Sequence, residues 1–289
     1  MLSVTVLISL VATVPTAAPA AELPTELWQV APDSGGKPWA PPAKPGGKSR
    51  AVVLVPGLWV HPLRPARAML PELRAWQAPK SELVKALAGD SDVFAFAYAQ
   101  TVPVDEVVRY PGLRDAVARL RKAGYKEVVL VGHSAGGIIA RQFAEAHPDA
   151  GVTKVICVGA PFEGAGAAKL RVGYPKIQAG FVKSLAPAAR AALAKANAHP
   201  PTDGVEFACV VCKLKRLESD GVVTVQSQWP EDLRHAGVPA VLARVGHVEA
   251  MQSAESVRVI AELAREKLTR WSPEEVEKAR RILFGEPQK

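Results

Sequence analysis

The amino-acid sequence predicts an α/β fold, with a mostly parallel sheet of about six strands flanked by helices on both faces. Continuous apolar runs of strand length recur along the chain, and segments with helical periodicity lie between them. In addition, 48% of the 289 residues are hydrophobic, which suits a large globular core. Runs that are apolar throughout are typical of strands covered on both faces, and alternation of strands with helices is typical of parallel sheets.

The chain begins with an uncharged segment, and we expect a signal peptide at residues 1–21. The apolar run 4–14 is too short to span a membrane, and Ala18, Pro19 and Ala20 form a small-residue site that suits cleavage. No Lys or Arg precedes the run, which departs from the usual pattern, and a buried N-terminal strand is the alternative. A signal peptide implies an exported protein, either secreted or periplasmic.

Residues 22–50 are expected to form a linker, because the segment 31–50 is rich in Pro, Gly and Lys and has little with which to build a core. The folded domain is therefore predicted over residues 51–289. Its expected strands are residues 51–57, 93–99, 127–132, 154–160, 205–212 and 240–245.

The segments between and after these strands carry helical signals. Leu113, Val117 and Leu120 share one helical face, and the apolar residues of 257–268 do the same after the last strand. Ser272 and Glu275 form a capping box with Pro273 at the first helical position, so a final helix is predicted to begin there. We expect this helix to end near Gly285.

The third expected strand runs directly into the pattern Gly132-x-Ser134-x-Gly136, which is typical of a nucleophile elbow. At a sharp strand-to-helix turn the residues two before and two after the serine approach each other, and glycine leaves room for this. The turn exposes the Ser134 hydroxyl at the carboxyl edge of the sheet, where parallel sheets bind ligands. The helical segment 138–147 favours an elbow over the alternative, a glycine-rich turn with an idle serine.

A nucleophilic serine needs a base and a group that orients the base. Among six histidines, His247 directly follows the last expected strand and therefore lies at the same sheet edge as Ser134. Asp220 precedes Gly221 in a predicted tight turn, which would place a carboxylate at this edge. An ordinary Asp–Gly turn is the alternative reading of this stretch, and Glu218 is the nearest substitute for Asp220.

The stretches GHSAGG, SDGVV and VGHVEAM, in this order, resemble the nucleophile, acid and histidine motifs of the α/β-hydrolases, in particular small bacterial-type lipases and carboxylesterases. The resemblance covers about residues 51–268. It implies that the first two, antiparallel strands of the full fold are absent, because residues 51–57 match the third strand. It also implies an oxyanion hole formed by the backbone N–H groups of Ala135 and Leu58.

The activity implied by the resemblance is hydrolysis of carboxylic (acyl or lipid) esters through an acyl-enzyme on Ser134. Thioester or amide hydrolysis on the same residues, and a silent binding protein with this fold, are the alternatives. No cofactor is expected, and the sequence contains no spacing typical of a zinc site. Cys157, Cys209 and Cys212 all lie on expected core strands, which favours buried, inert thiols.

Residues 161–204 form a candidate cap over the site. The net charge of the chain is +8, and most of it comes from residues 164–216, with nine Lys or Arg against two acidic residues. We hypothesise that the cap lines an acyl pocket and contacts an anionic membrane surface or substrate, and a solvated covering helix is the alternative. The expected partner is a small-molecule or lipid ester, and no nucleic acid partner is expected.

Overall fold

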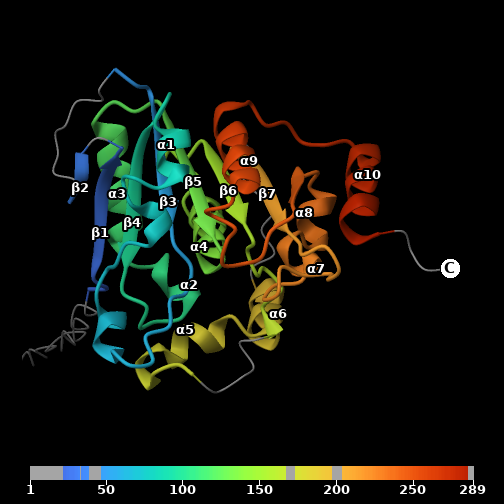
Figure 1. Ribbon diagram of the computed structural model, residues 1–289, viewed down its shortest axis with the longest axis horizontal. Coiled ribbons are helices and arrows are strands. Elements are labelled where there is room, and N and C mark those ends of the chain that lie inside the picture. Colours follow the sequence, from blue (N-terminus) through green and yellow to red (C-terminus); the bar gives the residue numbers. More distant parts are fainter. Residues whose placement is uncertain (1–21, 33, 39–46, 167–172, 197–203, 286–289) are drawn as a thin grey trace, which may run out of the picture.

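The computed structural model describes residues 22–32, 34–38, 47–166, 173–196 and 204–285, and a sheet of eight strands forms its centre (Figure 1). The order of the strands across the sheet is β2-β1-β4-β3-β5-β6-β7-β8. From β4 to β8 every neighbouring pair is parallel, which confirms the predicted sheet type. The strands are β1 (Thr25–Ala31), β2 (Ser34–Pro38), β3 (Arg50–Val55), β4 (Asp92–Tyr98), β5 (Glu127–His133), β6 (Lys154–Val158), β7 (Glu206–Cys212) and β8 (Ala240–Ala243).

The N-terminal edge of the sheet corrects the sequence-based prediction. β1 pairs antiparallel with β4, and β2 pairs antiparallel with β1, so the sheet has two strands more than expected. The prediction that two antiparallel strands are absent is therefore wrong, and both β1 and β2 lie within the predicted linker of residues 22–50. Leu27 and Val30 are buried, so β1 contributes to the core despite its polar neighbours. The predicted signal peptide and residues 39–46 lie outside the described residues.

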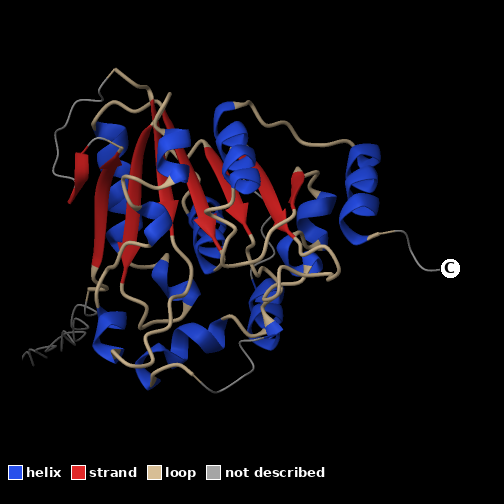
Figure 2. Ribbon diagram, in the orientation of Figure 1, coloured by secondary structure: helices blue, strands red, loops and turns tan. Residues whose placement is uncertain are grey.

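Helices cover both faces of the sheet (Figure 2). One core cluster lies between the sheet and α1 and α9, and the other lies under α3 and α4 on the opposite face. The α-helices are α1 (Glu82–Leu87), α2 (Val104–Val107), α3 (Pro111–Lys122), α4 (Ala135–Ala146), α5 (Ala179–Ser184), α6 (Pro187–Ala196), α7 (Val225–Gln228), α8 (Glu231–His235), α9 (Ala254–Arg265) and α10 (Pro273–Phe284). Short 3-10 turns are η1 (Pro65–Met69), η2 (Ala75–Gln77) and η4 (Lys176–Gln178).

The helices predicted from periodicity and capping correspond to α3, α4, α9 and α10. At the start of α10 the Ser272 hydroxyl accepts a hydrogen bond from the Glu275 N–H, and the Glu275 carboxylate accepts one from the Ser272 N–H. This is the predicted capping box, and the helix ends at Gly285 as expected.

The candidate cap contributes η4, α5 and the described part of α6, which lie beyond the ends of the strands in Figure 1. Phe181 of α5 is fully buried and stacks on Tyr98 at the end of β4, with 6.2 Å between the ring centroids. Residues 167–172 and 197–203 of the candidate cap lie outside the described residues.

All three cysteines are free and buried. Burial raises the pKa of the Cys209 thiol to about 12, so the thiolate that would react is scarce at neutral pH. In the part of the chain that the structure describes, we find no helix with the length and apolar character needed to cross a bilayer.

Candidate active site

Ser134 lies at the junction of β5 and α4 in an unusual backbone conformation. Its φ is 53° and its ψ is −125°, and among the described residues it is the one non-glycine residue with a positive φ. Such a conformation costs about 1–3 kcal/mol and persists where the surrounding structure enforces it, which is typical of functional sites. The strained turn places the hydroxyl at the carboxyl end of β5, as the elbow pattern predicts.

The close approach of the chain to itself explains the glycines around Ser134. A Cβ on Gly136 would lie 2.8 Å from the Pro56 carbonyl oxygen and closer still to that of Val55. A Cβ on Gly132 would overlap the backbone of Gly136 and Gly137. Both elbow glycines are therefore required by close packing: a side chain on Gly136 would collide with the end of β3, and one on Gly132 would collide with the first turn of α4.

His247 connects Ser134 to Asp220 through both of its ring nitrogens. The distance from His247 Nε2 to Ser134 Oγ is 3.0 Å, and that from His247 Nδ1 to Asp220 Oδ2 is 2.7 Å. An ionised carboxylate can only accept hydrogen bonds, so beside it Nδ1 carries the proton and Nε2 presents its lone pair to the hydroxyl. The structure thus brings together the three residues that the sequence selected from separate loops.

Asp220 is fixed in a tight turn after β7. Its side chain is fully buried, and Oδ1 accepts hydrogen bonds from the N–H groups of Val222 at 2.9 Å and Val223 at 2.7 Å. The side chain of Gln228 donates to Oδ2 at 3.3 Å. Glu218, the substitute considered from the sequence, instead points to solvent and pairs with Lys213 at 2.7 Å.

His133, inside the elbow, is a residue whose contact the sequence did not reveal. Its Nε2–H donates to the His247 carbonyl oxygen at 3.0 Å, and its ring lies edge-on to Trp76. The pKa of His133 is lowered to about 3, chiefly by burial and to a smaller extent by repulsion from His247. His133 therefore stays neutral and anchors the backbone of the loop that carries His247.

The loop after β3 passes directly beside Ser134. A Cβ on Gly57 would lie 2.7 Å from Ser134 Cβ and 2.8 Å from the His133 carbonyl oxygen, so this position also requires glycine. Leu58 follows Gly57 and packs partly buried against the core. Ala135 is the first residue of α4, where backbone N–H groups have no acceptor within the helix. The two expected oxyanion donors thus lie on the two segments that meet at Ser134.

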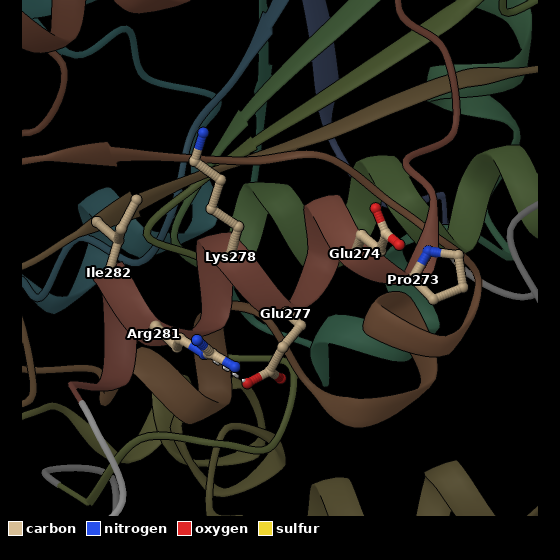
Figure 3. Close-up of a pocket in the computed structure, with 6 residues that line it drawn as sticks. All are labelled: Pro273, Glu274, Glu277, Lys278, Arg281 and Ile282. Atoms are coloured by element: carbon tan, nitrogen blue, oxygen red, sulfur yellow. Dashed lines mark hydrogen bonds and ion pairs between the residues drawn. The ribbon is translucent and has the colours of Figure 1, made fainter.

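A separate pocket lies along the outer side of α10 and is lined by Glu277, Lys278, Arg281 and their neighbours (Figure 3). Hydrogen bonds from Arg280 and Arg281 lower the pKa of Glu277 to about 2, so its charge is already paired. None of the lining residues belongs to the loops around Ser134. Among the described residues, no three His, Cys, Asp or Glu side chains are grouped in a way that could bind a metal ion.

Comparisons with known proteins identify the family and the fold of this chain. Residues 52–282 match the model of the alpha/beta hydrolase family. No curated protein matches the sequence. The mature form of a lipase from Bacillus licheniformis has a similar structure, with 16% identity and a TM-score of 0.57 over 78% of this chain and 96% of that one.

Two further solved structures show the same likeness. A metagenomic carboxyl esterase shares 16% identity with a TM-score of 0.51, over 90% of this chain and 82% of that one. The phospholipase PlaB from Legionella pneumophila shares 15% identity with a TM-score of 0.54, over 82% of this chain and 63% of that one. At these identities the similarity is one of fold.

Proposed function

This chain belongs to the alpha/beta hydrolase family, and from that premise we propose that it is a serine hydrolase that cleaves carboxylic esters. The observation that carries the proposal is the hydrogen-bonded series Ser134–His247–Asp220, in which each side chain is within reach of the next. A serine, a histidine and a buried carboxylate in this arrangement are able to perform nucleophilic acyl transfer. Ser134 is the proposed nucleophile, His247 the base and Asp220 the group that orients the base.

The proposed reaction has two steps. In the first, His247 Nε2 takes the proton of Ser134 Oγ as the oxygen attacks the ester carbonyl carbon, and the same proton then goes to the leaving alcohol. An acyl group is now bound to Ser134. In the second step His247 deprotonates a water molecule, which attacks the acyl carbonyl, and the proton returns to Ser134 as the acid leaves. Asp220 stabilises the imidazolium ion in both steps.

The negative charge that develops on the carbonyl oxygen needs hydrogen-bond donors. We assign this role to the backbone N–H groups of Ala135 and Leu58, on the two segments that meet at Ser134. The N-terminus of the twelve-residue helix α4 adds a favourable dipole at the same place. Removal of one such donor typically costs about 2.7–4 kcal/mol of transition-state stabilisation.

The surroundings of the site favour an ester with an apolar part. Large apolar side chains are exposed on the loops that carry the proposed machinery: Trp59 and Leu63 after β3, Val222 beside Asp220, and Val248 beside His247. Leu63 is 93% exposed and Val248 is 69% exposed, so both side chains are available to contact an apolar part of a substrate. The exposed Lys215 and Arg216 precede the Asp220 turn and would attract an anionic lipid surface. We therefore include lipid esters in the proposed substrate class.

Export is part of the same proposal. It rests on the signal-peptide pattern of residues 1–21. Expression of the full chain in a bacterial host, followed by N-terminal sequencing of the mature protein, tests it. Cleavage after residue 20 or 21 is expected, and an intact N-terminus on protein retained in the cytoplasm would contradict it.

A panel of p-nitrophenyl esters with increasing acyl length tests the function. Wild-type protein should release p-nitrophenol, with an initial burst equal to the amount of enzyme if deacylation is slower than acylation. The Ser134→Ala variant should show only the background rate, whereas Ser219→Ala, next to Asp220 but outside the proposed series, should remain active. Equal rates for wild type and Ser134→Ala would reject the proposal, and activity on thioesters or amides alone would replace the ester assignment.

A further inference from the structure

The loop that carries Leu58 makes unusual contacts with two buried glutamines. Gln100, at the end of β4, accepts a hydrogen bond from the Trp59 N–H at 2.8 Å and donates one to the Gly57 carbonyl oxygen at 2.8 Å. Gln178, in η4, accepts one from the His61 N–H at 3.2 Å and donates one to the Trp59 carbonyl oxygen at 2.8 Å. Both glutamines are almost completely inaccessible to solvent. Their amides thus satisfy alternate backbone groups along residues 57–61.

On the basis of the proposed function, we propose that Gln100 and Gln178 are positioning residues that hold residues 57–61 so that the Leu58 N–H faces the developing oxyanion. We call residues 57–61 the donor loop. Neither glutamine contacts Ser134, and both act through the backbone of this loop.

The orientation of the Leu58 N–H follows from peptide geometry. The Gly57 carbonyl and the Leu58 N–H belong to one planar trans peptide unit, in which the two bonds point in opposite directions. The hydrogen bond from Gln100 keeps the Gly57 carbonyl pointing towards Gln100, so the Leu58 N–H points away from Gln100. Gly57 itself packs against Ser134, so the donor is presented beside the nucleophile. Rotation of this one peptide would remove the donor from the site.

Each glutamine amide has one orientation that satisfies both of its contacts. Reversal of the Gln100 amide would place its NH₂ group against the Trp59 N–H and its oxygen against the Gly57 carbonyl. Two donors, or two acceptors, that face each other in a buried site leave both groups without a hydrogen-bond partner, and each such group costs roughly 1–3 kcal/mol of stability. The same holds for Gln178 between Trp59 and His61. The hydrogen bonds of the two glutamines therefore fix the backbone conformation of the donor loop.

Gln178 connects the donor loop to the candidate cap. Its position is fixed by α5, where Phe181 stacks on Tyr98 and the Ser184 hydroxyl accepts a hydrogen bond from the Val104 N–H at 3.0 Å. The Tyr98 hydroxyl in turn donates to the Pro56 carbonyl oxygen at 2.8 Å, at the start of the same loop. The described part of this segment around Gln178 thus acts as a brace for the donor loop.

The test replaces each glutamine with methionine, which has a similar volume but makes no amide hydrogen bonds. Gln77→Met is the matched control, because Gln77 is equally buried and bonds to the carbonyl oxygens of Leu54 and Phe96 instead of to the donor loop. For Gln100→Met and Gln178→Met we expect kcat on a p-nitrophenyl ester to fall about 10- to 100-fold with little change in KM, since a donor used only in the transition state is lost. Gln77→Met should change kcat less than about threefold. It should lower the free energy of unfolding by about as much as Gln100→Met and Gln178→Met do, because each variant loses the hydrogen bonds of one buried amide.

A trifluoromethyl ketone gives a second readout, because it adds to the serine and carries an oxyanion at the position of the transition state. Its affinity should fall by the same factor as kcat in Gln100→Met and Gln178→Met. If either variant does not fold, the shorter amide of Gln100→Asn or Gln178→Asn, which cannot reach both backbone groups, replaces it with the same expected loss.

The outcomes separate this inference from the proposed function. An active wild type whose glutamine variants lose no more kcat or ketone affinity than Gln77→Met would overturn the inference alone. A rise in KM at unchanged kcat would do the same, because it would place the glutamines in ground-state binding. A wild type that neither hydrolyses esters nor binds the ketone would overturn the inference together with the function on which it rests.

Discussion

Replacement of Asp220 by Asn probes the proposed division of roles at the site with a change of one atom. The N–H groups of Val222 and Val223 both donate to Oδ1, so the amide oxygen of Asn must occupy that position. The amide NH₂ group then takes the place of Oδ2, 2.7 Å from His247 Nδ1. Because this group donates, Nδ1 must give up its proton, and the proton moves to Nε2. A protonated Nε2 cannot accept the proton of Ser134.

The size of the effect follows from this change of tautomer. In serine hydrolases an Asp→Asn change at the orienting residue lowers kcat about 10⁴-fold while the geometry stays intact. At about 1.36 kcal/mol for each factor of ten, this corresponds to roughly 5 kcal/mol of lost transition-state stabilisation. Gln228 Nε2 loses its long contact to Oδ2 at 3.3 Å but keeps its bonds to the carbonyl oxygens of Cys212 at 2.9 Å and Val223 at 3.1 Å, so the fold should be little affected.

Steady-state hydrolysis of a short p-nitrophenyl ester by Asp220→Asn measures the effect. Glu218→Gln is the matched control, since it neutralises an exposed carboxylate in the same turn and should keep wild-type kcat. Circular dichroism verifies that both variants are folded. If Asp220→Asn keeps more than about a tenth of wild-type kcat, or if Glu218→Gln is the variant that loses activity, Asp220 does not have the proposed role.

Three further predictions concern stability. Gly136→Ala should lower the free energy of unfolding by about 1–3 kcal/mol or prevent folding, because its Cβ would meet the β3 backbone. Gly89→Ala is the control, since a Cβ there meets open space and should not destabilise the protein. Urea denaturation measures the stability of both variants. His133 has a folded pKa of about 3 against an ordinary 6.5, so the unfolded chain binds the extra proton and stability falls as pH drops from about 7 towards 4. In His133→Gln the free energy of unfolding should fall less steeply over this pH range, and the same slope as in wild type would contradict the prediction. Ser272→Ala should cost about 1 kcal/mol through loss of the α10 cap and leave kcat unchanged; a cost near zero would show that the cap is dispensable.

The parallel part of the sheet could be predicted because its strands are covered on both faces. β3 and β5 are apolar at nearly every position, and a signal of this kind is visible without knowledge of the partners. β1 gave no such signal. Its buried residues, Leu27 and Val30, are three apart, because the pairing with β2 is irregular between Gln29 and Ala31 and breaks the alternation of a half-buried strand. Its place in the sheet depends on pairing with β4, about 70 residues away, which local sequence does not encode.

The candidate site divides in the same way. Ser134, Asp220 and His247 could be selected because each follows a recognisable strand, and the carboxyl ends of parallel strands share one edge. Gln100 and Gln178 could not, because their role depends on which backbone groups a distant loop presents to them. The Gly57 position offered a weak signal, a Pro–Gly pair directly after β3. His133 lies inside the recognised motif, but its contact with the His247 backbone depends on the fold of two separate loops.

The most direct measurement of the central claim is covalent labelling by a fluorophosphonate, which reacts with serines activated by a neighbouring base. Mass spectrometry of the labelled, digested protein should place a single adduct on Ser134, and the adduct should be absent from Ser134→Ala. Labelling should also be strongly slowed in Asp220→Asn, since His247 can then no longer accept the proton. Wild-type protein that remains unlabelled, or an adduct that persists in Ser134→Ala, would contradict the account.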